Sequence, residues 1–281
     1  TLDNGLITVK PNIKFREVIK KVSSDDIVKD ASCDFDSTST LTLTERTIEP
    51  TYQSVNLQLC KKDFQNDWDA ISMGYSAHQS LPTSFSDFLI AHVASKVAQR
   101  TEQSIWSGAA ATNGQFGGFT ELMTADADIV DVAAVGGGVN SGNVIAQLGA
   151  VVDAIGSTLY TSEDMFIYVS QNVARAYVRA LGGFATNVGA AGINADGTQW
   201  YTGGTLSFDG VKLAVANGLA DNTMVAAEKS NLYFGTGLLS DQNEVKVIDM
   251  ADIDGSQNVR VVMRFTAGVQ YGIGSDIVLY S

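Results

Sequence analysis

The chain has 281 residues, of which 18 are Lys or Arg, 31 are Asp or Glu and 2 are Cys, so its formal charge is −13. An apolar fraction of 45% with only 17% charged residues excludes an intrinsically disordered chain, and two cysteines exclude a disulfide-stapled scaffold. A sequence pI near 4.4 argues against a nucleic-acid reader, which usually carries a basic excess.

Neither a membrane span nor a signal peptide is predicted. The best apolar stretch, residues 144–155, is shorter than the roughly 18 residues that a span requires, and it contains Gln147 and Asp153. The first ten residues, TLDNGLITVK, lack a basic start followed by an apolar core. We therefore expect no membrane partner.

The charge is unevenly distributed along the chain. Residues 1–62 carry nine basic and nine acidic side chains, whereas residues 63–281 carry nine basic and 22 acidic ones. Five basic residues near the N-terminus face only Glu17 as an acid: Lys10, Lys14, Arg16, Lys20 and Lys21. They form either a solvated basic arm or an arm that touches an anionic partner or the acidic part of a neighbouring copy.

Residues 1–31 lack a sustained hydrophobic period. Short apolar groups alternate with charges there, which predicts an extended arm with a short helix around residues 14–22. Such an arm rarely stays ordered unless it is tied to another surface.

Residues 38–60 carry the clearest β signal. Apolar or β-branched residues alternate with polar ones on both sides of Pro50, which predicts two strands joined by a turn. We expect a long antiparallel hairpin whose tip lies within residues 47–54. Because a two-stranded hairpin is marginally stable alone, it must lie on another body.

Residues 84–107 give the best helix in the chain. Eight residues recur at i, i+3, i+4 and i+7 spacing: Phe85, Phe88, Leu89, His92, Val93, Val97, Thr101 and Ile105. Ser84 and Asp87 resemble a capping box, and Gly108 suits a left-handed C-cap. About 24 residues make a rod of roughly 36 Å, and we expect His92 to be a buried core histidine.

Helices and strands alternate in the rest of the chain. Helices are predicted at 142–156, capped by Asn140 or Ser141, and at 172–181; a buried strand is predicted at 165–170 and a loop at 182–204. Seven further strands follow, at 206–208, 211–216, 224–228, 231–236, 245–250, 259–273 and 277–280. The fold class is therefore α+β with a β-rich C-terminal third.

No group of residues matches a catalytic or cofactor-binding motif. Gly136, Gly138 and Gly142 precede a helix, but their spacing is not that of a dinucleotide-binding loop, and a plain loop at a helix cap is favoured. The histidines and cysteines are too dispersed for a zinc site. No G-x-S-x-G motif marks a nucleophilic serine. The residues of a catalytic triad can lie far apart in sequence, so their spacing does not decide whether one forms.

A second candidate site is a cluster of acids near the C-terminus. Asp249, Asp252 and Asp254 before Gly255 resemble a calcium loop, but the EF-hand register and its bidentate Glu are missing. An Asp-Gly turn is favoured instead. We expect no catalytic residue, no metal and no cofactor, and hence no enzyme. In a monomer, the strand edges and apolar faces of the predicted arm and hairpin would be left without partners. This favours a protein that assembles with copies of itself.

The order of these parts resembles the major capsid proteins of tailed bacteriophages with the Hong Kong 97 fold. The stretch SFSDFLIAHVASKVAQRTEQSIWSGAAATNGQFGGFTELM looks like the family's spine helix and the segment after it. The matching positions are Glu102, Trp106 to Gly108, Gly114, Gln115, Gly118 and Phe119. The stretch LTLTERTIEPTYQSVNLQLCKKDF, followed by Trp68 and MGYSAHQSLP, is similar to capsid proteins of crAss-like phages and their relatives. The ending VRVVMRFTAGVQYGIGSDIVLY, with Arg264, resembles the family's last strands.

The resemblance implies a Hong Kong 97-type capsid fold with five segments. They are an N-terminal arm (1–32), an extended hairpin or E-loop (33–72), a peripheral domain with the spine helix (73–125), an axial domain (126–250) and C-terminal strands that return to the peripheral domain (251–281).

The implied function is structural. Family members form hexamers and pentamers of an icosahedral shell that encloses double-stranded DNA without reading its sequence. The implied partners are other copies of the chain, a portal and auxiliary capsid proteins, and the implied location is the virion, assembled in the cytoplasm of a bacterial host. We expect the inter-subunit contacts at the hairpin tip and the basic arm: Thr47, Ile48, Glu49, Pro50, Lys14, Arg16, Lys20 and Lys21. No Lys occurs at 47–54, so a covalent crosslink there is not predicted.

Two alternatives are compatible with the sequence. An encapsulin-like compartment shell shares the fold and would package protein cargo instead of DNA. An α+β enzyme or glycan-binding module is the alternative from another class.

Overall fold

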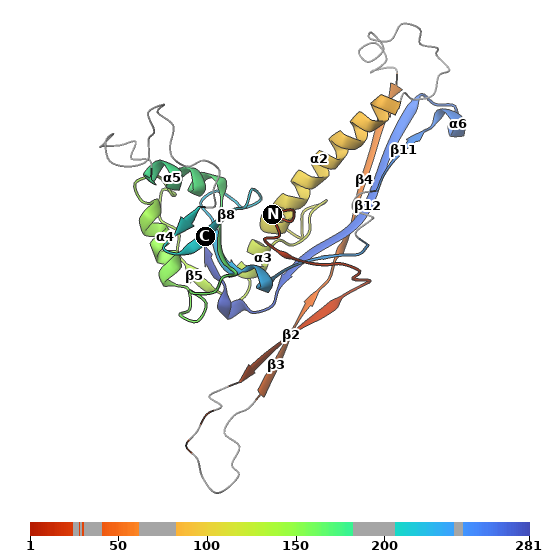
Figure 1. Cartoon of the computed structure of the whole chain (residues 1–281). Coiled ribbons are helices and arrows are strands. Elements are labelled where there is room, and N and C mark those ends of the chain that lie inside the picture. The colour runs from red at the N-terminus through yellow and green to blue at the C-terminus, as the bar shows by residue number, and fades with distance from the viewer. Residues whose placement is uncertain (25–27, 29, 31–40, 62–82, 182–205, 239–243) are drawn as a thin grey trace.

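The computed structural model describes residues 1–24, 28, 30, 41–61, 83–181, 206–238 and 244–281. Figure 1 shows three parts that extend in different directions: a body of helices and strands, a long helix that lies along a sheet, and a thin β-hairpin. Several predictions fall outside the described residues, among them those on Cys33, Trp68, His78 and the loop at 182–204.

The long helix and a five-stranded sheet pack together and form one part of the molecule. Helix α2 (Thr83–Ser107) confirms the predicted spine helix and, at 25 residues, spans about 37 Å. Its apolar stripe packs on alternate residues of the central strand β12 (Asn258–Tyr271). Antiparallel neighbours of β12 are β4 (Thr51–Cys60), β10 (Leu232–Thr236) and β11 (Val245–Asp249), and β1 (Thr8–Lys10) runs parallel to β10.

The second sheet forms the body. Its strands, in order across the sheet, are β5 (Val130–Val132), β13 (Val278–Tyr280), β9 (Met224–Glu228), β6 (Met165–Val169), β8 (Val211–Val215) and β7 (Ser207–Phe208). Helices α4 (Val144–Asp153) and α5 (Gln171–Leu181) share a core with it. The predicted stripe of α4 is buried as expected, from Val144 to Ile155. Its predicted cap is wrong, because Asn143 is the N-cap residue and makes no side-chain capping bond.

Trp106 joins the two parts. It is fully buried at the end of α2, with ring centroids 5.4 Å from Phe119 and 4.9 Å from Tyr168. Phe119 begins the short helix α3 (Phe119–Thr124), and Tyr168 lies in the body sheet. The core around Trp106 therefore runs continuously from the α2 sheet into the body. No helix in the described part of the chain is long and apolar enough to cross a bilayer.

Gly108 is required by close packing and not by a left-handed cap. Its φ is not positive, so that prediction is wrong. A Cβ at Gly108 would overlap the carbonyl oxygens of Phe116 and Ser104, and the amide of Gly118 donates to the Gly108 carbonyl at 2.8 Å. The chain can therefore turn back closely against the end of α2 because Gly108 has no side chain.

The N-terminal segment lies on its own chain. The Thr1 hydroxyl donates to Glu102 and accepts from Trp106 Nε1 at 3.1 Å, and Tyr168 donates to the Leu6 carbonyl at 2.6 Å. Ile7 is buried and β1 joins the sheet. Residues 1–10 of the predicted arm are therefore tied to this subunit.

The predicted hairpin at 38–60 is wrong in its pairing, although both of its strands exist. Strand β3 (Leu41–Ile48) pairs with β2 (Glu17–Ser24), whereas β4 pairs with β12. At Glu49 and Pro50 the chain leaves the ladder with β2 and enters the ladder with β12. Pro50 has no N–H to continue a ladder, so it suits such a change of partner as well as it suits a turn.

Residues 17–24 form a strand instead of the predicted short helix at 14–22. Val18, Ile19 and Val22 are β-branched and favour a pleated strand over a helix. The observed hairpin is therefore β2–β3, and residues 47–54 lie at its base.

Candidate inter-subunit surfaces

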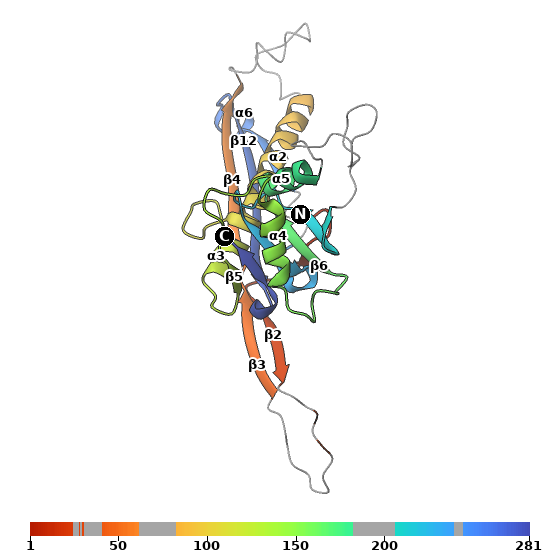
Figure 2. The ribbon, with the colours of Figure 1, turned by 90° about the vertical axis from the view of Figure 1, so that its left-hand side faces the viewer.

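The β2–β3 hairpin projects from the body as a two-stranded ribbon (Figure 2). Its register places Val22 opposite Leu43, Lys20 opposite Glu45 and Val18 opposite Thr47. Opposed residues share a face of a ribbon, and alternate residues along a strand share it too. These six residues form what we call the outer face of the hairpin: Val18, Lys20, Val22, Leu43, Glu45 and Thr47.

The outer face exposes apolar side chains. Val18, Val22 and Leu43 are 40%, 61% and 64% exposed. Lys20 and Glu45 form an ion pair of 3.4 Å between them, so the two charges neutralise each other within the ribbon. A ribbon of two strands with an uncovered apolar face has too little buried surface to be stable alone. This face is therefore suited to burial against another surface.

The opposite face of the hairpin meets the body at its base. Ile48 is fully buried, and a Cβ placed on Gly235 of β10 would lie 2.7 Å from Ile48 Cδ1 and 2.8 Å from Ile13 Cδ1. A Cβ placed on Gly268 of β12 would lie 3.0 Å from the Glu49 carbonyl oxygen. Because Gly235 and Gly268 have no side chains, the base of the hairpin can pack closely against the sheet.

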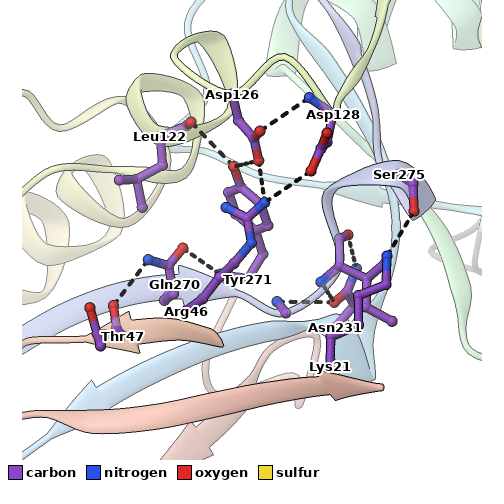
Figure 3. A network of polar contacts seen from close by, with 12 residues as sticks. Lys21, Arg46, Thr47, Leu122, Asp126, Asp128, Asn231, Gln270, Tyr271 and Ser275 are labelled. Carbon is purple, nitrogen blue, oxygen red and sulfur yellow. Dashed lines mark hydrogen bonds and ion pairs between the residues drawn. The ribbon is translucent and has the colours of Figure 1, made fainter. Parts of the chain in front are cut away.

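Arg46 is the centre of a polar network above this base (Figure 3). Its Nη2 forms an ion pair with Asp126 Oδ2 and lies 3.9 Å from Asp128 Oδ2. The guanidinium lies over the ring of Tyr271, 4.5 Å from its centroid. The Tyr271 hydroxyl in turn donates to Asp126 Oδ2 at 2.7 Å. Arg46 thus contacts Asp126 and Tyr271 while these two bind each other.

Several weaker contacts surround the network. Gln270 donates to the Thr47 carbonyl at 3.1 Å, and Lys21 donates to Ser275 Oγ at 3.3 Å. A Cβ at Gly274 would lie 2.9 Å from Asp126 Oδ2 and 3.2 Å from Arg46 Nη2. The turn after β12 therefore leaves room for the ion pair at a glycine.

The electrostatics of the network favour an ionised Asp126. Burial raises the pKa of the Asp126 carboxyl, but hydrogen bonds from Tyr271, the Asp128 amide and Arg46 together with the Arg46 charge outweigh it, so the pKa is lowered overall. Burial and then the bond to Asp126 raise the pKa of the Tyr271 hydroxyl, which keeps it a donor.

A groove of about 470 Å³ runs between α2 and β4. Its lining includes the apolar residues Val55, Val93 and Phe265. His92, Lys96 and Arg100 also line it, at i, i+4 and i+8 along one flank of α2. His92 is exposed, and its ring lies 6.2 Å from that of Phe88. The prediction of a buried core histidine is wrong, because the buried stripe of α2 runs through Phe85, Leu89 and Val93.

The four residues predicted at the hairpin tip lie instead at the base of the β2–β3 hairpin, and the four predicted residues of the basic arm lie in β2 or just before it. Five of these residues are exposed: Thr47, Glu49, Lys14, Arg16 and Lys20. Pro50 is half-buried, and Lys21 donates a hydrogen bond to Ser275. Ile48 is buried within its own chain.

Arg46, Asp126 and Tyr271 were not predicted as site residues. Asp126 lies 80 positions from Arg46 and 145 positions from Tyr271. No spacing in the sequence connects them, so only the fold could identify the network.

The remaining motifs have structural roles. Gly137 and Gly138 adopt positive φ, and the loop is held by Asn222 Oδ1, which accepts from the Val139 amide at 2.8 Å. Lys61 binds Asp249, and the short helix α6 (Ala251–Asp254) ends on Gly255 at φ 70°, which confirms the Asp-Gly turn. Within the described ranges no group of three or more His, Cys, Asp or Glu residues is arranged to hold a metal ion.

The sequence matches no family model and no curated protein. Solved structures do match it over almost its whole length. The capsid of an empty GTA particle gives a TM-score of 0.63 at 14% identity, covering 99% of this chain and 88% of that chain. A chain from Mycobacterium phage Adephagia gives 0.60 at 13%, covering 98% and 88%. The capsid of cyanophage P-SCSP1u gives 0.58 at 13%, covering 100% and 87%.

These comparisons establish the fold. The chain has the mixed helix-and-sheet fold of phage capsid proteins, as the resemblance implied. The likeness to crAss-like phages stays a prediction.

Proposed function

We propose that the chain is a major capsid protein, a structural subunit that assembles with its own copies into hexamers and pentamers of an icosahedral shell. The observation that carries the proposal is the projecting hairpin with its uncovered apolar outer face. The fold shared with capsid chains supports it over nearly the full length.

The physical reason is that the outer face gains stability only when another surface covers it. Burial of apolar area contributes roughly 25 cal/mol per Å², and the neighbouring copy is the surface that is always available in an assembly. Each contact is small, but contacts repeated around a closed ring reinforce one another. A hairpin that extends beyond its own body can therefore link subunits without a large interface on the body itself.

The proposed contact set differs from that expected from the sequence. Val18, Val22 and Leu43 are its apolar members, and Lys20, Thr47 and Glu49 remain as exposed polar ones. Ile48 leaves the set because its side chain is already buried. Lys14 and Arg16 are exposed between β1 and β2 and stay candidates for contact with an acidic neighbour.

We propose a domain division that keeps the five kinds of segment expected from the sequence but assigns several strands differently. The extended loop corresponds to β2–β3, while β4, β10 and β11 belong with α2 and β12 in the peripheral domain. The body sheet with α4 and α5 corresponds to the axial domain, and it includes the C-terminal strand β13, which was expected in the peripheral domain.

We propose packaged double-stranded DNA as the content of the shell, held by confinement. A formal charge of −13 does not favour adhesion of DNA to the wall. A portal and auxiliary capsid proteins are the further partners proposed, and the virion, assembled in host cytoplasm, is the proposed location. Particles with an absorbance ratio typical of nucleic acid would support DNA content, whereas particles that contain only protein would favour an encapsulin-like compartment.

The assembly proposal is tested by adding charge to the outer face. The double variant Val22→Asp/Leu43→Asp should fold, as judged by circular dichroism, but should form no particles by light scattering and electron microscopy. Thr44→Asp is the matched control, because Thr44 is exposed on the same strand but points to the other face. Normal particles from the double variant would exclude the outer face as a subunit contact.

A further inference from the structure

We propose that Arg46, Asp126 and Tyr271 act as a latch that sets the direction in which the hairpin leaves the body. The three residues are positioning residues: they bind one another within one chain and hold the outer face where a neighbour can cover it. The assembly consequence rests on the proposed function, whereas the latch itself is a property of the single subunit.

The hairpin is attached to the body at its base by backbone and packing contacts. The amides of Asn12 and Ile13 donate to the carbonyls of Gly237 and Thr236 at 2.7 and 3.1 Å, and Ile48 packs on Gly235. These contacts fix where the ribbon starts. A two-stranded ribbon held only at its start can still tilt, because no second layer supports it.

Arg46 provides a charged point of attachment further along the ribbon, where the exposed hydrogen bond of Lys21 to Ser275, at 3.3 Å, is another polar contact with the body. Arg46 lies two residues beyond Ile48 on the same face, roughly 7 Å along the strand, while the described end of β3 at Leu41 lies roughly 23 Å from Ile48. A shift of about 1 Å at Arg46 would therefore become roughly 3 Å at Leu41. Small changes in this contact are amplified at the part of the hairpin that reaches outward.

The chemistry of the latch favours one orientation of the guanidinium. Asp126 is held by the Tyr271 hydroxyl at 2.7 Å and by the Asp128 amide at 3.1 Å, so the carboxylate is oriented before Arg46 binds it. The Tyr271 ring supports the flat face of the guanidinium, which a lysine ammonium would not match in shape. Both charged side chains are largely shielded from water, at 27% and 17% exposure, so the pair is stronger than a surface pair.

The hairpin contains a second ion pair that serves as an internal control. Lys20 and Glu45 lie on the outer face at 3.4 Å, both more than half exposed. They connect β2 to β3 and do not contact the body through this pair. Breaking this pair removes an ion pair from the same ribbon, while Arg46 keeps its contacts with Asp126 and Tyr271.

The latch is tested by measuring the direction of the hairpin in unassembled subunits. Spin labels at Thr44→Cys and Asp153→Cys, in the full chain with Cys33→Ser and Cys60→Ser, report the distance between hairpin and α4 by electron paramagnetic resonance. Both label sites are exposed and lie outside the network. The unaltered latch and the control Glu45→Gln should give the same narrow distance distribution.

Variants of the latch should broaden this distribution. We expect at least a twofold increase in width for Arg46→Gln and Asp126→Asn. Arg46→Lys should give a smaller increase because it keeps the charge, and so should Tyr271→Phe because it keeps the ring. Unchanged narrow distributions in Arg46→Gln and Asp126→Asn would overturn the latch. If Asp126→Asn does not fold, Arg46→Gln and Tyr271→Phe, which leave the carboxylate in place, decide the question.

The assembly consequence has a separate readout. Subunits with a released hairpin should form particles that vary in diameter, because the direction of the hairpin fixes the angle between neighbours. Uniform particles of normal diameter from Arg46→Gln would overturn this consequence but not the latch, which is measured in free subunits. Loss of particles in Val22→Asp/Leu43→Asp tests the outer face itself, so the two proposals fail by different outcomes.

Discussion

Ile48 places its Cδ1 atom where a side chain on Gly235 would have to be, 2.7 Å from the position of its Cβ. The residue that ends β3 is thereby inserted into the surface of β10, about 190 residues further along the chain. This contact fixes the root of the hairpin in the sheet and makes Gly235 a position without space for any larger residue.

Replacing Gly235 by Ala should destabilise the protein. The added methyl group would press on Ile48 and Ile13, and overpacking a tight core costs about 1–3 kcal/mol. Urea unfolding should show a lower midpoint with an unchanged slope. Gly149→Ala is the control, because a Cβ there meets nothing within 4 Å and lies inside α4. That substitution should stabilise by about 0.5–1 kcal/mol, and a destabilised control would contradict the packing argument.

Replacing Gly108 by Ala should be at least as damaging. The new Cβ would overlap the backbone oxygens of Phe116 and Ser104, which cannot move without shifting the end of α2. Gly136→Ala, where the space is open, serves as the comparison. Equal thermal midpoints for the two variants would show that the chain after α2 does not need the close approach.

Removing the ring of Trp106 should cost more than any surface change. Trp106 is fully buried where the α2 sheet meets the body, and truncation of such a residue to Ala typically costs about 3–5 kcal/mol. Trp106→Phe should recover part of this loss, because the ring contacts with Phe119 and Tyr168 are kept. Denaturant midpoints for the two variants test the order. A loss below about 1 kcal/mol for Trp106→Ala would argue against a shared core.

Acid should weaken the latch between Arg46 and Asp126. The pKa of Asp126 is lowered in the folded state, so its contribution to stability is present above the ordinary aspartate pKa of about 3.9 and is lost as pH falls through the lower folded value. The difference in unfolding midpoint between the unaltered chain and Asp126→Asn should therefore be full at pH 7 and shrink at strongly acidic pH. The exposed Asp153→Asn is the control. A difference that stays constant down to acidic pH would contradict the assignment.

The local elements were predictable from the sequence because their signals are local. The stripe at Phe85, Leu89 and Val93 identified α2, and the alternation in 259–273 identified β12, since each pattern states which face of an element is buried. The fold class and the resemblance to capsid proteins followed from the order of such elements, and both agree with the structural matches.

The partner of each strand was decided only by the tertiary structure. Alternation around Pro50 predicts two strands equally well whether they pair with each other or, as observed, with β2 and β12. The same limit applies to Arg46, Asp126 and Tyr271, which meet across separations that no periodic pattern encodes. Periodicity reports burial along one element, whereas strand partners and ion pairs depend on how distant elements pack. The sequence thus determined the parts of this protein, and packing decided how the hairpin is joined to the body.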